Sequence, residues 1–79
     1  MAQQVALSDI RDVKKSELDD ARIKTLLNGY NSFDEVLNSK SDPIALDKGR
    51  GKPYDIVDGR HRIYLARQKG YKAVPVIFA

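Results

Sequence analysis

The sequence predicts an α+β fold, with a small mixed sheet of about four strands and two to three helices in the order β-α-α-β-β-α-β. Three observations lead to this expectation. Short runs rich in β-branched and aromatic residues, which favour strands, recur along the chain. Other segments place apolar residues at helical spacing. A serine with an acidic residue three positions later, a signal for the start of a helix, precedes two of these segments.

The N-terminal half is expected to contain one strand and two helices. The strand is residues 5–7, and a charged connection follows it. Ser16 then matches an N-cap with Asp19 in the third helical position, a capping box in which aspartate replaces the usual glutamate. The apolar face of this helix repeats at helical spacing. It consists of Ile23, Leu26, Leu27 and Tyr30.

A second, shorter helix is predicted from about residue 33 to 38. Ser32 and Glu35 form a full capping box in front of it. Residues 43–46 and 54–57 are expected to be strands, joined by a loop in which glycines alternate with basic residues. The two strands and this loop would form a hairpin-like arrangement.

The C-terminal part is expected to form a helix and a last strand. Residues 59–69 show helical spacing, and Gly70 fits the position just after a helix. The last strand, 74–78, contains Pro75, which predicts an edge strand or a bulge because proline cannot donate a hydrogen bond to a sheet. We expect residues 1–79 to form a single domain. Its predicted core consists of Leu7, Ile23, Leu26, Leu27, Phe33, Val36, Leu37, Ile44, Leu46, Ile56, Ile63, Ala66, Val74, Val76 and Phe78.

The junction at Asp58 and Gly59, where a strand turns into a helix, has the composition of an anion site. The first amides of a helix have no backbone partner, the helix dipole is positive there, and glycine lets a ligand approach the backbone closely. Asp58 is the predicted N-cap, accepting from the amide of Arg60 or His61. The sequence therefore favours a bound anion at this turn.

Two arginines in the first turn of this helix are unfavourable for the helix itself. Exposed cations there oppose the dipole and cost about 0.3–1 kcal/mol each. Residues that oppose the local preference of a helix without an evident gain in stability are typical of a functional site. Phosphate binding by Arg60 and Arg62 is one interpretation, and the alternative is that both side chains simply face solvent on a basic surface.

Charge is distributed unevenly along the chain, whose formal net charge is +3. Residues 1–47 carry six Lys or Arg against nine Asp or Glu, whereas residues 48–79 carry eight against two. The positive half contains the predicted anion site. This coincidence favours a nucleotide or a nucleic acid as the ligand.

Composition also excludes several kinds of protein. The chain has no cysteine, which excludes disulfides and thiolate metal sites. No apolar run approaches the roughly 18 residues of a membrane span, and the N-terminus lacks a signal-peptide pattern. We therefore expect no membrane partner and a site of action in the cytoplasm, which delivery as part of a secreted toxin would also permit.

The C-terminal half of the chain resembles the ParB/sulfiredoxin-like superfamily. The similar segments are Pro43-Ile44 to Leu46, Tyr54 to Arg62 with its Asp-Gly-Arg-His-Arg turn, Ala66 to Gly70, and Val74-Pro75-Val76. The N-terminal half is similar only as a short strand followed by helices. In this superfamily the turn binds phosphates: those of CTP in chromosome-partitioning ParB proteins, of ATP in sulfiredoxin and of ADP in free-serine kinases.

The resemblance implies a phosphate site at this turn. By position, Gly59, Arg60, His61 and Arg62 would bind the phosphates, and Asp58 and, from the basic loop, Lys52 are further candidate residues of the site. Asp58 would cap the helix or help to hold a Mg²⁺ ion that accompanies a nucleotide, and no tight zinc site is expected. Lys48, Arg50 and Lys52 share one loop, which would close over the phosphates or follow a nucleic-acid backbone. A solvated turn is the alternative for that loop.

If the domain is an enzyme, His61 and Arg62 are the candidate catalytic residues. His61 is the only histidine of the chain and would act as a general acid or base. The alternatives are that it only donates a hydrogen bond to phosphate or lies on the helix surface without a role. Its pKa is expected to be lowered by the neighbouring arginines. Arg62 would hold the charge that develops on the phosphate. A base from the N-terminal half, as in the free-serine kinases, would be Glu17, Asp12 or Asp9.

Two functions of the superfamily are excluded. Sulfinic-acid reduction is excluded because Arg60 stands where sulfiredoxin has its cysteine. A complete partitioning protein is excluded because these 79 residues hold neither its helix-turn-helix domain nor its dimerisation tail.

Three functions stay open. The first function is a small nuclease or phosphodiesterase acting on nucleic acid or nucleotides, of the kind found in bacterial polymorphic toxins, where an acidic immunity protein would be its partner. The second is a non-catalytic nucleotide- or DNA-binding module. The third is an interaction domain whose basic half binds an acidic protein.

Overall fold

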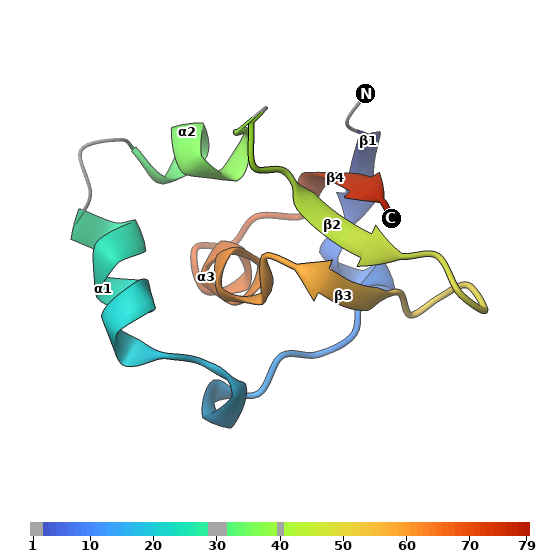
Figure 1. Ribbon diagram of the computed structural model, residues 1–79, viewed down its shortest axis with the longest axis horizontal. Helices are drawn as coiled ribbons and strands as arrows, with labels where there is room; N and C mark the ends of the chain where they lie inside the picture. The colour runs from blue at the N-terminus through green and yellow to red at the C-terminus, as the bar shows by residue number, and fades with distance from the viewer. Residues whose placement is uncertain (1–2, 29–31, 40) are drawn as a thin grey trace.

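A computed structural model describes residues 3–28, 32–39 and 41–79 and shows an α+β fold (Figure 1). Two short 3-10 turns, Leu7–Asp9 and Lys15–Glu17, lie between the first strand and the first helix. The predicted small mixed sheet with helices is confirmed. The strands and α-helices are β1 (Gln3–Ala6), α1 (Asp20–Asn28), α2 (Phe33–Leu37), β2 (Ile44–Asp47), β3 (Asp55–Asp58), α3 (Arg60–Gln68) and β4 (Ala73–Phe78).

The four strands form one sheet in the order β1-β4-β2-β3. β4 is antiparallel to β1 and parallel to β2, while β2 and β3 form an antiparallel pair. Parallel neighbours need a long crossover connection, and here β3 and α3 supply it between β2 and β4. The crossover places the β3–α3 junction in the middle of the molecule (Figure 1).

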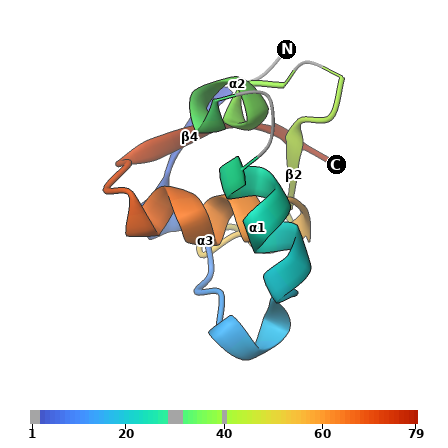
Figure 2. The same ribbon diagram turned by 90° about the vertical axis from the view of Figure 1, so that its left-hand side faces the viewer.

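The core lies between the sheet and α3. Figure 1 shows α3 between the sheet and α1, and in Figure 2 α1 lies in front of α3. Burial alternates along β4, as expected for a strand with one face against a core. The buried apolar cluster is Val5, Leu7, Ile10, Leu37, Ile44, Leu46, Ile63, Ala66, Val74 and Val76. Phe33, Ile56 and Phe78, also predicted for the core, pack against this cluster but are only half-buried.

The first helix contributes less to the core than its sequence predicts. No residue of α1 is buried, and Leu27 is 50% exposed. Ile23 and Leu26 are half-buried. The prediction that Leu27 belongs to the core is wrong because α1 lies on the far side of α3 from the sheet, and only part of its apolar face meets α3 and α2. Tyr30 lies outside the described residues.

The start of α1 also differs from the prediction. Ser16 lies in the 3-10 turn Lys15–Glu17, so it is not the N-cap. Asp19 precedes the helix instead: its Oδ1 accepts from the Ala21 amide at 3.0 Å, and its carbonyl accepts from the Ile23 amide at 3.1 Å. Aspartate is a strong N-cap residue, so it starts the helix three residues later than predicted.

Pro75 does not mark an edge strand, because β4 is an inner strand with a regular register. Pro75 pairs with Gln4 of β1, whereas the pairing with β2 starts one residue later, at Val76 opposite Ile44. Pro75 therefore lies just outside the β2–β4 ladder, where its missing N–H removes no bond to β2. The Ser32 cap was predicted correctly, since its side chain accepts from the Glu35 amide.

Candidate functional site

Gly59 forms the junction between β3 and α3. Its backbone, with φ 100° and ψ 21°, lies in the left-handed region that other residues rarely adopt. A Cβ at this position would lie 2.9 Å from Ile44 Cγ1 and 3.2 Å from Arg62 Nη2. Both the backbone conformation and the space around it therefore require glycine.

The first turn of α3 leaves backbone amides without helical partners. The helix begins with a bond from the Ile63 amide to the Gly59 carbonyl, at 3.0 Å. The amides of Arg60, His61 and Arg62 precede that bond, so they have no acceptor within the helix. Such amides, together with the positive end of the helix dipole, attract an anion.

Asp58 does not cap α3, so the prediction of an N-cap there is wrong. Gly59 occupies the N-cap position, and Asp58 is the last residue of β3. Its side chain is exposed and makes no described hydrogen bond to the first turn of α3. The Asp58 carboxylate therefore lines the cleft and does not cap the helix.

A β-bulge brings β3 to the junction. Leu46 of β2 pairs with Ile56, and the preceding β2 residue, Ala45, pairs with Asp58. Val57 is thus the extra residue, and it is 59% exposed. Bulges bend a strand and re-aim its side chains. Here the bent end of β3 forms one wall of a cleft.

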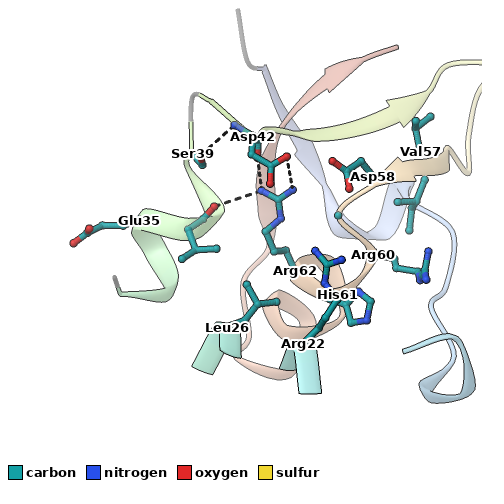
Figure 3. Close-up of a pocket in the computed structure, with 13 residues that line it drawn as sticks. Arg22, Leu26, Glu35, Ser39, Asp42, Val57, Asp58, Arg60, His61 and Arg62 are labelled. Carbon is teal, nitrogen blue, oxygen red and sulfur yellow. Dashed lines mark hydrogen bonds and ion pairs between the residues drawn. The ribbon is translucent and has the colours of Figure 1, made fainter. Parts of the chain in front are cut away.

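This cleft has a volume of about 260 Å³ and opens at the β3–α3 junction (Figure 3). Its walls come from α1, from α2 and the loop after it, from the end of β3, and from the first turn of α3. Figure 3 shows Arg22 rising from α1 beside His61, whereas Glu35 points away from the arginines. The charged residues that line the cleft, besides His61, are Arg22, Arg60, Arg62, Glu35, Asp42 and Asp58. The apolar ones are Leu26, Val36, Ile56 and Val57.

Arg62 is held inside the wall of the cleft. It is 6% exposed, and its Nη1 donates to the Asp42 carbonyl at 2.6 Å and to the Val36 carbonyl at 3.5 Å. Its Nη2 lies 3.9 Å from the Asp42 carboxylate. These contacts join the start of α3 to the end of α2 and to the loop before β2. Arg62 therefore shapes the cleft and has only part of its guanidinium left for a ligand.

His61 is buried beside the cleft, with 8% of its surface exposed. Its Nε2 accepts a hydrogen bond from the Asp19 backbone amide at 2.9 Å. Burial, and then the positive charges of Arg60 and Arg22, lower the pKa of His61 below its usual value, against a smaller opposing effect of Asp19. The direction agrees with the sequence prediction, but burial is the leading cause. Because Nε2 is occupied by the amide, this arrangement argues against proton transfer by His61.

Arg60 and Arg22 are the arginines with groups left for a ligand. Arg60 is exposed, and its Nε donates to the Glu17 carbonyl at 2.9 Å. Its terminal nitrogens make no described hydrogen bond. Arg22 is exposed and has no ion pair among the described residues. A guanidinium of this kind recognises phosphate oxygens with two parallel hydrogen bonds.

Several residues expected at the site lie elsewhere. Lys52 is not part of the cleft, and its ammonium forms an ion pair with Asp9 at 3.2 Å. The loop with Lys48 and Lys52 lies at the far end of β3 from the junction (Figure 1), with Lys48 near the Phe78 ring. Asp9, Asp12 and Glu17, the expected sources of a base, do not line the cleft either.

Three charged residues of the cleft were not predicted from the sequence. These are Arg22, Glu35 and Asp42. Glu35 had been assigned only to a capping box, and no local signal singles out the other two. Together they make the cleft less positive than the basic C-terminal half suggests, since its lining contains three arginines and three acidic residues.

The side chains of the cleft offer little for a metal held by protein alone. Within residues 3–28, 32–39 and 41–79, no three His, Asp or Glu side chains gather as metal ligands. Mg²⁺ is often held by one or two carboxylates together with the phosphates of a substrate. Asp58, at the mouth of the helix N-terminus, fits that second arrangement.

No protein-family model matches this chain, and a comparison with curated proteins finds no match. Among the described helices, none has the length and apolar character needed to cross a bilayer.

Proposed function

We propose that the protein binds the phosphate groups of a nucleotide or a nucleic acid in the cleft at the β3–α3 junction. The observation that carries this proposal is that the first-turn amides of α3 and two guanidinium groups line one cleft of about 260 Å³. The Arg22 group has no described ion pair, and the terminal nitrogens of Arg60 make no described hydrogen bond. Helix N-termini and arginines both hold phosphate in many proteins.

The fold and the turn also support a relationship to the ParB/sulfiredoxin-like superfamily, which we propose for this chain. A strand that enters a helix through Gly59 is where the resemblance implies a phosphate site. Arg62 contributes through the shape of the cleft, because its Nη1 is engaged by backbone carbonyls. Arg60 and the backbone amides would make the direct contacts.

Charge balance in the cleft favours a ligand that arrives with a divalent cation. Asp58 is not paired with a cation in any described ion pair, so a bare polyphosphate would be repelled by its carboxylate. A Mg²⁺ ion bound by Asp58 and by the phosphates would neutralise this repulsion. We therefore expect tighter binding of a nucleoside di- or triphosphate in the presence of Mg²⁺.

Phosphodiester or nucleotide hydrolysis is the second candidate function. Its supporting observation is the position of Asp58, an exposed carboxylate beside the proposed phosphate site. A carboxylate there could accept a proton from water, a role for which His61 is poorly placed while its Nε2 receives the Asp19 amide. Asp58→Asn should then abolish turnover while the nucleotide still binds.

The proposal is tested by calorimetric titration with ADP, ATP, CTP and a short DNA duplex, each with and without Mg²⁺. Arg60→Ala should weaken binding of the preferred ligand about tenfold, as expected for loss of one charge-assisted contact. Arg50→Ala, the same chemical change on the exposed loop far from the cleft, is the matched control and should leave binding unchanged. Equal effects of the two variants would contradict the proposed site. The same samples, assayed for hydrolysis, separate binding from catalysis.

A further inference from the structure

The hydrogen bond between Asp19 and His61 joins two distant parts of the chain. The Asp19 amide donates to His61 Nε2 at 2.9 Å, across 42 positions in the sequence. The imidazole is 8% exposed. A buried histidine that accepts from a backbone amide is part of the framework of the cleft, and its protonation state matters for that framework.

Asp19 is the residue on which α1 starts. Its side chain accepts from the Ala21 amide and its carbonyl from the Ile23 amide. With its own amide bound to His61, Asp19 fixes the first turn of α1, the turn that carries Arg22. Because no residue of α1 is buried, few other contacts fix this wall of the cleft.

A proton on His61 would break this arrangement. A neutral imidazole has one nitrogen that accepts, whereas in the imidazolium both nitrogens carry hydrogen. The Asp19 N–H would then face another N–H group, at a distance where two donors repel each other. The charged groups of the elements around the ring are Arg60 on α3, Arg22 on α1, Asp19 before α1, Asp58 on β3 and Glu35 on α2. Burial and the two nearby arginines oppose the imidazolium and lower the pKa of His61.

We propose that His61 is a positioning residue whose neutral ring holds the α1 wall of the cleft, so that proton uptake by His61 releases this wall and weakens anion binding. The inference rests on the proposed phosphate site and adds a regulation of that site by pH. His61 is the only histidine, and no other side chain with an ordinary pKa changes charge between about pH 5 and 8.

The test is a titration of ¹⁵N-labelled protein with sulfate at about pH 7.5 and about pH 5.5. Sulfate keeps its charge over this range, whereas phosphate groups titrate near pH 6 and would confuse the result. We expect sulfate binding to weaken as the His61 ring takes up its proton, by about fivefold to tenfold once the ring is fully charged, the effect of losing one hydrogen bond. The Asp19 amide resonance should move together with the His61 ring resonances.

His61→Gln is the matched variant. A glutamine carbonyl can accept from the Asp19 amide but takes up no proton in this range. The N-terminal amino group and the carboxylates are unchanged, so any difference from the wild type belongs to His61. Whatever its affinity at the higher pH, we expect this variant to show no weakening of sulfate binding at the lower pH. If the variant does not fold, the wild-type protein still tests the inference, through the movement of its Asp19 amide resonance as His61 titrates.

Two results would overturn the inference. One is an Asp19 amide resonance that stays in place while His61 titrates. The other is tighter sulfate binding at the lower pH, which simple attraction to an imidazolium would produce. Absence of sulfate binding at both pH values would instead overturn the phosphate site and any effect of pH on it, while the Asp19 resonance would still show whether His61 holds α1.

Discussion

The guanidinium of Arg62 donates to the carbonyl oxygen of Asp42 at 2.6 Å, from a side chain that is only 6% exposed. This bond connects the first turn of α3 to the loop before β2. The arginine that ends the Asp-Gly-Arg-His-Arg turn is therefore part of the scaffold of the cleft. Its neighbour Arg60 is exposed and available to a ligand.

Replacing Arg62 should cost stability first. Arg62→Ala removes the charge-assisted bond to the Asp42 carbonyl and should lower the free energy of unfolding by about 2–3 kcal/mol. Arg62→Lys should recover only part of this loss, because an ammonium cannot reproduce the planar fork of donors. Urea denaturation of both variants measures the effect. Arg60→Ala is the control, and a loss of stability as large as that of Arg62→Ala would contradict this division of roles.

Gly59 should tolerate no side chain. Gly59→Ala places a Cβ 2.9 Å from Ile44 Cγ1 in a backbone conformation with φ 100°. The strain should lower the free energy of unfolding by about 1–3 kcal/mol. Gly51→Ala is a matched control, since Gly51 also has φ 100° but has open space around its Cβ position. Denaturation measures the loss in the free energy of unfolding for both variants. The amount by which the loss for Gly59→Ala exceeds the loss for Gly51→Ala is the cost of the contact with Ile44. Equal losses would show that the contact with Ile44 is unimportant.

Arg22 should contribute to binding without contributing to stability. Its guanidinium lies in the cleft and has no described ion pair, so Arg22→Ala should weaken nucleotide binding about fivefold and leave unfolding unchanged. The affinity should also depend less on salt, because one phosphate contact is lost. Lys24→Ala, an exposed cation of the same helix that does not line the cleft, should have little effect. Comparable losses from both variants would indicate a general attraction by charge.

Stability should fall as the pH is lowered through the mildly acidic range. The pKa of His61 is lower in the folded protein than its usual 6.5, so the unfolded chain binds a proton first. Stability rises with pH where the unfolded state binds more protons, so its loss begins below about pH 6.5 and continues down to the folded pKa. Urea denaturation at stepped pH should show this slope in the wild type and not in His61→Gln. A flat wild-type profile down to about pH 5 would contradict a depressed pKa.

A second acid-sensitive contribution should act at lower pH. The Lys14 amide, and then Arg11, lower the pKa of the Glu17 carboxyl below 4.5. The stabilisation is therefore present above pH 4.5 and is lost as the pH falls through the folded pKa. Glu17→Gln should change only this part of the profile and leave the slope from His61 intact.

Two apolar substitutions should separate the core from the surface. Ile63 is 0% exposed, and Ile63→Ala should lower the free energy of unfolding by about 2–5 kcal/mol through lost contacts and a cavity. Leu27 is 50% exposed, and Leu27→Ala should cost less than about 1 kcal/mol. Thermal or urea unfolding measures both. Similar costs would mean that α1 packs more closely than described.

The features that could be predicted from sequence are those set by local chemistry. The Gly59 turn and the Ser32 cap depend on a few adjacent residues, so their sequences are sufficient. The start of α1 was placed wrongly because two capping signals, Ser16 and Asp19, lie three residues apart. Asp19 is also held by the bond from its amide to His61 of α3, a contact that the local sequence does not show.

The features that could not be predicted depend on packing between distant segments. The Asp19 amide reaches His61 only because α1 lies against α3. Pro75 was expected at an edge or a bulge, but β4 is an inner strand of the sheet and its register is regular. The charge pattern assigned Lys52 to the phosphate site, whereas the β2–β3 hairpin carries it to the opposite end of β3.

The most direct test of the phosphate site is an amide-resolved ¹⁵N titration with ADP and Mg²⁺. The site described here predicts shifts centred on Gly59, Arg60, His61 and Arg62, with weaker shifts around Arg22. The hairpin residues 48–52 should remain unchanged. Shifts confined to that hairpin, or no shifts at the first turn of α3 with ADP, ATP, CTP or a DNA duplex, would contradict phosphate binding at this junction.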